Sequence, residues 1–344
     1  MKNLIKTFLY AVFALVALVS ATSCSSSDND VIIPSPASQK VAIIDAGSSG
    51  SRLHIYEVKY GNSISEIYPS NAEEKAASKG RALSTVANHP DSVRAYYNSM
   101  TSCYTTTDTA HIPLYILATA GMRLEEQSKT EGIYGKLRSI GQANGFNLQN
   151  AMTISGRYEG LYAWIAVNYE NGTLTSSPKG IIEVGGASMQ LAFATTSTTL
   201  PADNSIQRTG WGTIYSKSYL GGGINEVYAN TPDVEPFNFT VPLEDVSAYY
   251  PSNATFFGCS TPLQVALNGI SEKGSFEAYV ASLPRTDTNH SYVFAYYMKW
   301  LFENLHLEGK VTPVNSNAKW TEGAAYDILI NKQQPEEFSY DTKL

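Results

Sequence analysis

The sequence predicts an α/β protein with two lobes that contain copies of one structural unit, each lobe with a mixed sheet, and with a cleft between them. Two observations point to this fold class. Strands and helices alternate along the first half of the chain, which is typical of α/β folds. An apolar strand, an acidic residue, a Gly/Ser-rich turn and a second strand occur in that order around Asp45 and again around Glu183. This recurrence indicates an internal duplication, and a chain of 344 residues is long enough for two lobes.

The first copy is a hairpin at the start of the folded part, which we place at Lys40. Residues 41–44 are apolar and predict a buried strand that ends at Asp45. A Gly/Ser turn follows, and residues 53–58 predict the second strand. The elements expected between the two copies are helices at 90–103, 124–143 and 158–169, and strands at 112–119 and 152–154.

The second copy repeats this order. Glu183 lies near the end of an apolar strand at 180–184, and small residues at 185–188 form a turn before a strand at 189–194. Residues 196–289 have few clear periods, and helices are predicted at 292–304 and 320–331. We assign the lobes as 40–155 plus 311–344 for lobe I and 156–310 for lobe II.

The N-terminus has the features of a targeting segment. Two lysines precede an apolar run at residues 8–19, which is too short for an ordinary membrane span. Cys24 follows a small residue shortly after this run, which predicts a lipoprotein signal peptide at 1–23 and acylation of the Cys24 thiol; a plain secretory signal is the alternative. Residues 24–39 are rich in Ser, Asp and Pro and predict a flexible tether. We therefore expect a protein of the bacterial envelope, lipid-anchored at its periplasmic face or at the cell surface.

The composition excludes several classes of function. The net charge is −7 and no basic stripe is present, so nucleic acid is not an expected partner. None of the 5 histidines lies in the candidate motifs, so neither a phosphohistidine nor a zinc site is indicated. After removal of the signal peptide and Cys24, Cys103 and Cys259 remain, and a disulfide or two unpaired thiols are both open.

The segment Asp-Ala-Gly-Ser-Ser-Gly-Ser-Arg at Asp45–Arg52 is the strongest local signal. Gly47 and Gly50 allow a tight turn and a close approach to a ligand, and hydroxyl and backbone N–H groups there form an anion site. Asp45 at the strand end offers oxygen ligands to Mg²⁺ or Ca²⁺. The alternative is an ordinary hairpin turn.

Three other segments carry candidate site residues. Thr119, Gly121 and Arg123 lie between a strand and a helix, where the hydroxyl and guanidinium can bind an acidic group or only cap the turn. Glu159 begins a helix, where an acid is often only a partner of the helix dipole. Ser188 and Gln190 follow the second glycine turn and share one face of a strand, so they can hold one water between them.

In this order the segments resemble the first four signature regions of the apyrase, or nucleoside triphosphate diphosphohydrolase, family. The matching segments are Asp45–Arg52, Ala118–Arg123, Gly156–Asn168 and Glu183–Gln190, with later matches at Tyr215–Gly221 and Trp320–Gly323. The resemblance implies the two-lobed fold of actin, hexokinase and Hsp70. Two departures are Glu183 in place of the family's Asp and Lys217 where His is common.

The resemblance also implies a role for each candidate site residue. Glu159 corresponds to the general base, with Ser188 and Gln190 orienting the attacking water. Asp45 and Glu183 correspond to the pair that holds a metal through water, near Trp320. The implied phosphate binders are Gly47, Ser48, Ser49, Gly50, Ser51, Arg52, Thr119, Gly121, Arg123, Gly185, Gly186 and Ala187. Aromatic residues near the family's base pocket correspond to Tyr292 and Tyr297, although such spacing is more typical of core.

The expected activity is hydrolysis of terminal phosphates of nucleoside tri- or diphosphates, giving nucleoside monophosphate and phosphate, with Mg²⁺ or Ca²⁺ and a water activated by Glu159. The expected partners of this protein, taken as a monomer, are the nucleotide and a membrane through the lipid anchor. Two alternatives stay open. One is an exopolyphosphatase or guanosine pentaphosphate phosphatase of the same fold, and the other is a non-catalytic, lipid-anchored nucleotide-binding protein.

Overall fold

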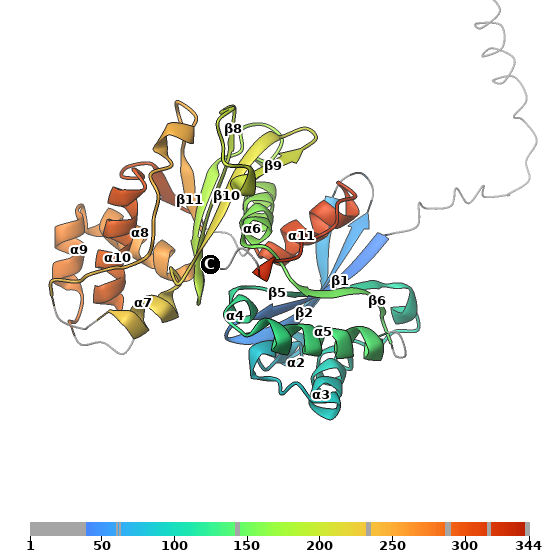
Figure 1. Ribbon diagram of the computed structural model, residues 1–344. Coiled ribbons are helices and arrows are strands. Elements are labelled where there is room, and N and C mark those ends of the chain that lie inside the picture. The colour runs from blue at the N-terminus through green and yellow to red at the C-terminus, as the bar shows by residue number, and fades with distance from the viewer. Residues whose placement is uncertain are drawn as a thin grey trace, which may run out of the picture. The chain divides into compact units, whose positions relative to one another are not determined.

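The computed structural model in Figure 1 describes residues 39–340, except residues 60, 62, 142–144, 232–234, 286–289 and 315–317. The predicted signal peptide, Cys24 and all of the tether except Gln39 lie outside the described residues. Within the described part of the chain, no helix is both long and apolar enough to cross a membrane.

The first sheet is mixed, as predicted for lobe I. Its central strand β1 pairs antiparallel with β2 and parallel with β5, and the strand order is β3-β2-β1-β5-β6, with β4 paired to β2. Its strands are β1 (Gln39–Gly47), β2 (Gly50–Lys59), β3 (Ser63–Tyr68), β4 (Lys79–Gly80), β5 (Pro113–Ala118) and β6 (Asn147–Thr153). The helices that follow in this part of the chain are α2 (Ala72–Ala77), α3 (Pro90–Thr101), α4 (Ala120–Arg123) and α5 (Gln127–Gly141). Apolar residues of α3 and α5 form one buried cluster with one face of the sheet.

The second sheet repeats the central hairpin of the first. β7 pairs antiparallel with β8 and parallel with β11, and the order is β12-β11-β7-β8-β10-β9. Its strands are β7 (Gly180–Val184), β8 (Ser188–Thr195), β9 (Ser205–Arg208), β10 (Gly212–Leu220), β11 (Phe256–Gly258) and β12 (Val311–Pro313). Its outer face forms a buried cluster with residues of α8 (Thr261–Lys273), α9 (Phe276–Ser282) and α10 (Ser291–Asn304). The helix α7 (Ile224–Asn230) follows β10 in the chain.

Two helices, α6 (Gly156–Glu170) and α11 (Trp320–Leu329), lie between the sheets (Figure 1). Their apolar residues belong to one cluster with the inner faces of both sheets. The two helices approach at backbone distance, because a Cβ atom placed on Gly323 would lie 1.9 Å from the carbonyl oxygen of Tyr162. The ring of Trp320 stacks on that of Tyr162 with centroids 6.4 Å apart. The lobes are therefore joined through a continuous packed layer.

The α/β fold with two mixed sheets is confirmed, but three boundaries differ from the prediction. The helix predicted at 124–143 begins later, at Gln127 of α5, because Leu124 and Glu125 bond back to Ala120 and Met122 and end the preceding helix α4. The strand predicted at 152–154 starts earlier, since the whole of β6 pairs with β5. The chain does not return to lobe I at residue 311, because β12 still pairs with β11.

Candidate active site

The two hairpins place an acidic residue at equivalent positions. Asp45 in β1 lies opposite Arg52, and Glu183 in β7 lies opposite Gln190. In both hairpins the acid is two residues before the pair that closes the turn, since the backbone N–H of Gly185 donates to the carbonyl of Ser188 at 2.9 Å. The two hairpins inferred from the sequence therefore also share the same strand register relative to their turns.

Strand alternation explains why these side chains converge. Ile43 in β1 and Ile181 in β7 belong to the cluster around α6 and α11, so the acids two residues further on, Asp45 and Glu183, project from the same inner faces. Ala192 in β8 belongs to that cluster too, which puts Gln190 and Ser188 on the inner face of the second sheet. The residues of both hairpins thus face the layer in which α6 begins, close to Glu159.

The tips of the hairpins meet at Ser48. A Cβ atom placed on Gly186 would lie 2.9 Å from Ser48 Oγ, and one placed on Gly121 would lie 2.8 Å from Ser48 Cα. A side chain at Gly121 would force its backbone away from that of Ser48, whereas one at Gly186 would displace the Ser48 hydroxyl, which explains why small residues occur there. Three segments that were predicted to bind phosphate, the two hairpin turns and the turn before α4, are therefore in direct contact.

Glu159 lies in the first turn of α6, where its side chain is 13% exposed, and it forms an ion pair with Arg123 of α4. Burial raises the pKa of the Glu159 carboxyl, and the charge of Arg123 and the hydrogen bonds from Arg123 and Gln190 oppose this rise. Burial therefore favours the neutral form of this carboxyl, and the Arg123 cation favours its ionised form. An acid that only compensates the helix dipole would not need the ion pair with Arg123 and the hydrogen bond from Gln190.

A chain of hydrogen bonds connects Glu159 to the predicted water-orienting residues. Arg123 Nη1 donates to Ser218 Oγ at 3.1 Å, and Gln190 Nε2 donates to the same oxygen at 3.2 Å and to Ser188 Oγ at 2.6 Å. Gln190 is 1% exposed, and its Oε1 atom has no hydrogen-bond partner. A buried acceptor without a donor is costly unless a ligand or water satisfies it, so this oxygen is suited to hold a water molecule.

The acidic groups raise one another's pKa values. Burial, chiefly, and the nearby charges of Glu159 and Asp45 raise the pKa of Glu183 to about 8. Burial, chiefly, and the charge of Glu159 raise the pKa of Asp45 to about 7, although the charge of Arg52 and a hydrogen bond from Trp320 lower it. A cation bound beside these carboxyls would favour their ionised forms.

The donor set fits a divalent metal that is held through water. Asp45 Oδ1 is buried without a hydrogen-bond partner. Among the residues that the structure describes, no three His, Cys, Asp or Glu side chains are grouped closely enough to ligate one ion together. Mg²⁺ commonly keeps several waters and uses one or two carboxylates, so Asp45 and Glu183 suffice for such an ion. Trp320, at the start of α11, contacts Asp45 as the predicted neighbour of the site.

Several predicted phosphate binders have other contacts. Arg123 is 3% exposed and points to Glu159 and Ser218 instead of to open space. The buried hydroxyl of Ser51 accepts a hydrogen bond of 2.7 Å from Tyr96 of α3. Thr119 is buried before α4, and Arg52 is exposed. Gly121 lies in α4 against Ser48, and the other predicted binders lie in the two hairpin turns: Gly47, Ser48, Ser49, Gly50, Gly185, Gly186 and Ala187.

The nucleobase prediction is wrong for Tyr297 and gains no support at Tyr292. Tyr297 is fully buried in the outer cluster of the second sheet, and its hydroxyl donates to the carbonyl of Gly222 at 2.7 Å. Tyr292 is buried in the same cluster and hydrogen-bonds to Glu235. The aromatic residues of α10 pack as core, as their helical spacing also indicates.

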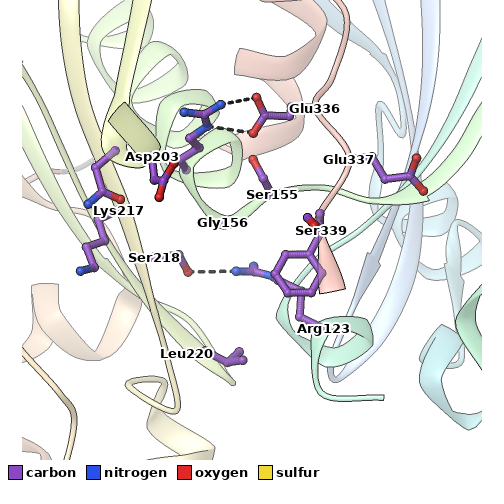
Figure 2. Close-up of a pocket in the computed structure, with 13 residues that line it drawn as sticks. Arg123, Ser155, Gly156, Asp203, Lys217, Ser218, Leu220, Glu336, Glu337 and Ser339 are labelled. Atoms are coloured by element: carbon purple, nitrogen blue, oxygen red, sulfur yellow. Dashed lines mark hydrogen bonds and ion pairs between the residues drawn. The ribbon is translucent and has the colours of Figure 1, made fainter. Parts of the chain in front are cut away.

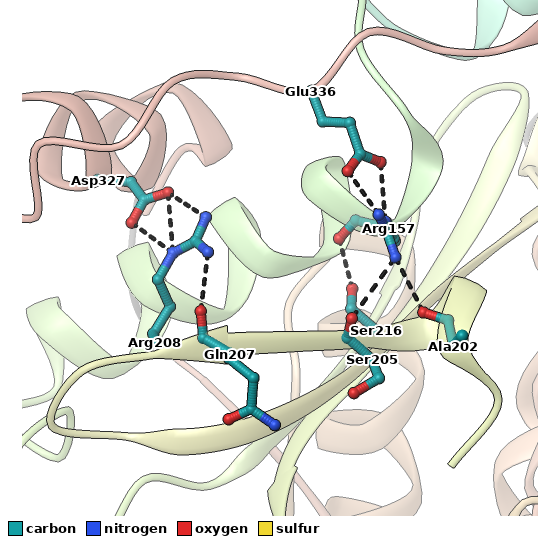
Figure 3. Close-up of polar contacts among 8 residues, drawn as sticks. All are labelled: Arg157, Ala202, Ser205, Gln207, Arg208, Ser216, Asp327 and Glu336. Atoms are coloured by element: carbon teal, nitrogen blue, oxygen red, sulfur yellow. Dashed lines mark hydrogen bonds and ion pairs between the residues drawn. The ribbon is translucent and has the colours of Figure 1, made fainter.

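A pocket of about 540 Å³ opens beside this network, with walls from both lobes (Figure 2). Its lining includes Arg123 of α4, Ser218 of β10, the N-terminal end of α6 and the segment 336–339. Neither hairpin turn nor Glu159 lines this pocket, which meets the network only at Arg123 and Ser218. At its edge, Arg157 of α6 forms paired hydrogen bonds of 2.8 and 2.5 Å with Glu336 (Figure 3).

The described cysteines are free thiols. Cys103 and Cys259 are both unpaired and partly buried. Lys217, which replaces the histidine expected from the resemblance, forms an ion pair of 2.6 Å with Glu244. Neither feature adds a ligand to the acidic site.

Two lobes that each carry a glycine hairpin and an acid facing the layer that contains Glu159 place the protein in the actin-like two-lobed class. Residues 33–233 match the GDA1/CD39 (nucleoside phosphatase) family, and the chain belongs to this family.

Its relatives include apyrases. "Probable apyrase 6" of Arabidopsis thaliana is 32% identical over 206 residues, which cover 54% of this chain and 36% of that protein. Ectonucleoside triphosphate diphosphohydrolase 1 of Mus musculus is 29% identical over 246 residues, which cover 61% of this chain and 45% of that protein. The chain therefore spans less than half the length of these two relatives.

A solved structure confirms the fold. The Ppx/GppA family member of Aquifex aeolicus has 16% sequence identity and a TM-score of 0.55, and the match covers 86% of this chain and 99% of that one. At this level of identity the similarity concerns the fold alone, and it shows that the described chain contains both lobes of that architecture.

Proposed function

We propose that the protein hydrolyses the terminal phosphate of nucleoside tri- and diphosphates with a water molecule that Glu159 deprotonates. The observation that carries this proposal is the buried network in which Glu159 and the partnerless Oε1 atom of Gln190 are connected through Arg123 and Ser218. Relatives named apyrase and ectonucleoside triphosphate diphosphohydrolase support a nucleotide substrate.

The hairpin turns supply the phosphate site. Backbone N–H groups and hydroxyls in concave glycine turns bind phosphate oxygens and stabilise the charge that spreads over them during transfer. Ser48 contacts both Gly121 and Gly186, so donors from both lobes act on one phosphoryl group. A metal held through water by Asp45 and Glu183 would neutralise phosphate charge.

The chemical step is an in-line displacement. The oxygen of the water bonds to phosphorus, the bond from phosphorus to the leaving phosphate oxygen breaks, and the water's proton moves to the Glu159 carboxylate. Gln190 Oε1 accepts a hydrogen bond from this water, and Ser188 holds the Gln190 amide at 2.6 Å. Burial makes Glu159 more basic than an exposed glutamate, while the charge of Arg123 favours its ionised form.

A phosphate-release assay tests the proposal. The protein is incubated with ATP, ADP, GTP and inorganic polyphosphate in Mg²⁺, in Ca²⁺ and in EDTA. We expect phosphate from the nucleotides with either metal and none in EDTA. Release from polyphosphate alone would replace the proposal by the exopolyphosphatase alternative, and tight nucleotide binding without release would identify a non-catalytic nucleotide-binding protein.

We also propose that a lipid on Cys24 holds this domain at a membrane surface of the bacterial envelope. The support is the apolar run at residues 8–19 and the small residue before Cys24. The substrate in this location would be a nucleotide outside the cytoplasm.

A further inference from the structure

Ser218 lies on the face of β10 that is turned toward α6. Ile214 belongs to the cluster around α6, whereas Tyr215 and Tyr219 belong to the outer cluster, so Ser216 and Ser218 follow Ile214 on the inner face. This face carries serines where a buried strand usually carries apolar residues. A polar group in such a place needs a hydrogen-bonding role.

The Ser218 hydroxyl joins two groups that come from different lobes. It accepts from Arg123 Nη1 at 3.1 Å and from Gln190 Nε2 at 3.2 Å (Figure 2 shows the first contact). Arg123 pairs with the candidate base, and Gln190 carries the oxygen that is free to hold water. Ser218 Oγ is thus the shared acceptor of the two side chains that set where base and water lie.

On the side of α6, little space is left for rearrangement. A Cβ atom placed on Gly156 would lie 2.4 Å from Ser218 Cβ and 2.5 Å from Arg123 Nη1. The first residue of α6 is therefore packed directly against this contact. If the hydroxyl were removed, Arg123 Nη1 and one hydrogen of the Gln190 amide would lose their acceptor, and the Nε atom of Arg123 already has none.

We propose that Ser218 is a positioning residue that holds Arg123 and Gln190 in register, so that Glu159 and Gln190 act on the same water. The inference rests on the proposed hydrolytic function and adds a role for a residue of the second lobe. Ser218 acts through Arg123 and Gln190.

The test compares Ser218→Ala with Ser216→Ala. Ser216 is the matched control, because its hydroxyl faces the same helix but donates to the carbonyl of Arg157 at 2.6 Å and lies outside the network. The assay is phosphate release from the best nucleotide substrate of the parent. We expect kcat of Ser218→Ala to fall roughly 10-fold, because Arg123 and Gln190 both lose an acceptor, while KM changes less than about threefold.

The pH profile separates positioning from packing. In Ser218→Ala, Arg123 is less well held and lowers the pKa of Glu159 less effectively. The acidic limb of kcat/KM should therefore move to higher pH by about half a pH unit or more. Ser216→Ala should keep the parent's limb. The inference is overturned if kcat of Ser218→Ala stays within about twofold of the parent value and its acidic limb does not move. It is also overturned if Ser216→Ala loses as much kcat and shifts the limb as far. A parent without activity on any nucleotide would overturn the proposed function itself, which the comparison of variants does not test.

Discussion

Without divalent metal, the stability of this protein should decrease as the pH rises from about 5 to about 8. Glu183 has a pKa of about 8 in the folded chain, against an ordinary value of 4.5. A carboxyl with a raised pKa stabilises the folded state below its ordinary pKa, and this contribution is lost as the pH rises through the folded value. Asp45, raised from 3.8 to about 7, contributes with the same sign.

The size of the effect follows from the same values. At about 1.4 kcal/mol for each pH unit, the rise from 4.5 to about 8 gives Glu183 alone an upper value of about 5 kcal/mol. Asp45, Glu159 and Glu183 ionise against one another, so we expect about 2–5 kcal/mol in total. For a domain of this size that is a fall in Tm of roughly 3–8 °C.

The measurement is thermal unfolding in EDTA and in Mg²⁺ or Ca²⁺ at several pH values. The cation should stabilise the protein more at about pH 8 than at about pH 5, because it binds the ionised carboxylates. Glu183→Gln should show a flatter pH dependence and a smaller cation effect, and Glu131→Gln, a change on the exposed side of α5, should behave as the parent. Stability in EDTA that is constant or rises over this range, or a cation effect that Glu183→Gln leaves intact, would refute this reasoning.

Further predictions concern the base, the packing between the helices and the anchor. Glu159→Gln should lower turnover by about 10²–10⁴-fold while nucleotide binding survives, and retention of more than about a tenth of parent turnover in a phosphate-release assay would exclude Glu159 as the base. Gly323→Ala should destabilise the fold by at least about 2–3 kcal/mol, because its Cβ would lie 1.9 Å from the Tyr162 carbonyl, whereas Gly135→Ala, with open space around it, should melt at or above the parent temperature; similar denaturation midpoints for both variants would contradict this. Cys24→Ser should move the protein from the membrane to the soluble fraction, and an unchanged distribution would count against the lipid anchor.

The duplicated hairpins could be predicted because local sequence specifies them. Apolar strands, glycine turns and acids follow one another within a few residues at Asp45 and Glu183, and the structure places them in equivalent register. Interactions between distant segments were not visible at this level. The pair of Arg123 with Glu159 depends on how α4 of one lobe packs beside α6, so Arg123 was assigned to phosphate instead.

The strand β10 was missed for a physical reason. Its inner face carries Ser216 and Ser218 where apolar alternation would be expected, because these hydroxyls bond to α6 and to the network. The hydrophobic period is therefore broken where the strand contributes to the site. At Tyr297 the helical spacing indicates core correctly, and the misleading signal is the resemblance to the family's base pocket.

The layer of α6 and α11 determines how the two lobes are able to move. Both helices share one apolar cluster with the inner faces of the two sheets, and Gly323 brings α11 against the backbone of α6. Helices packed this closely can slide by a small shear, but they cannot separate without exposing that cluster. Trp320 contacts Asp45 at one end of α11, and Asp327 near the other end pairs with Arg208 of β9 at 2.7 Å (Figure 3). A shift of the second sheet would therefore move α11 through the pair of Arg208 with Asp327. This movement would change the contact between Trp320 and Asp45 at the other end of the helix.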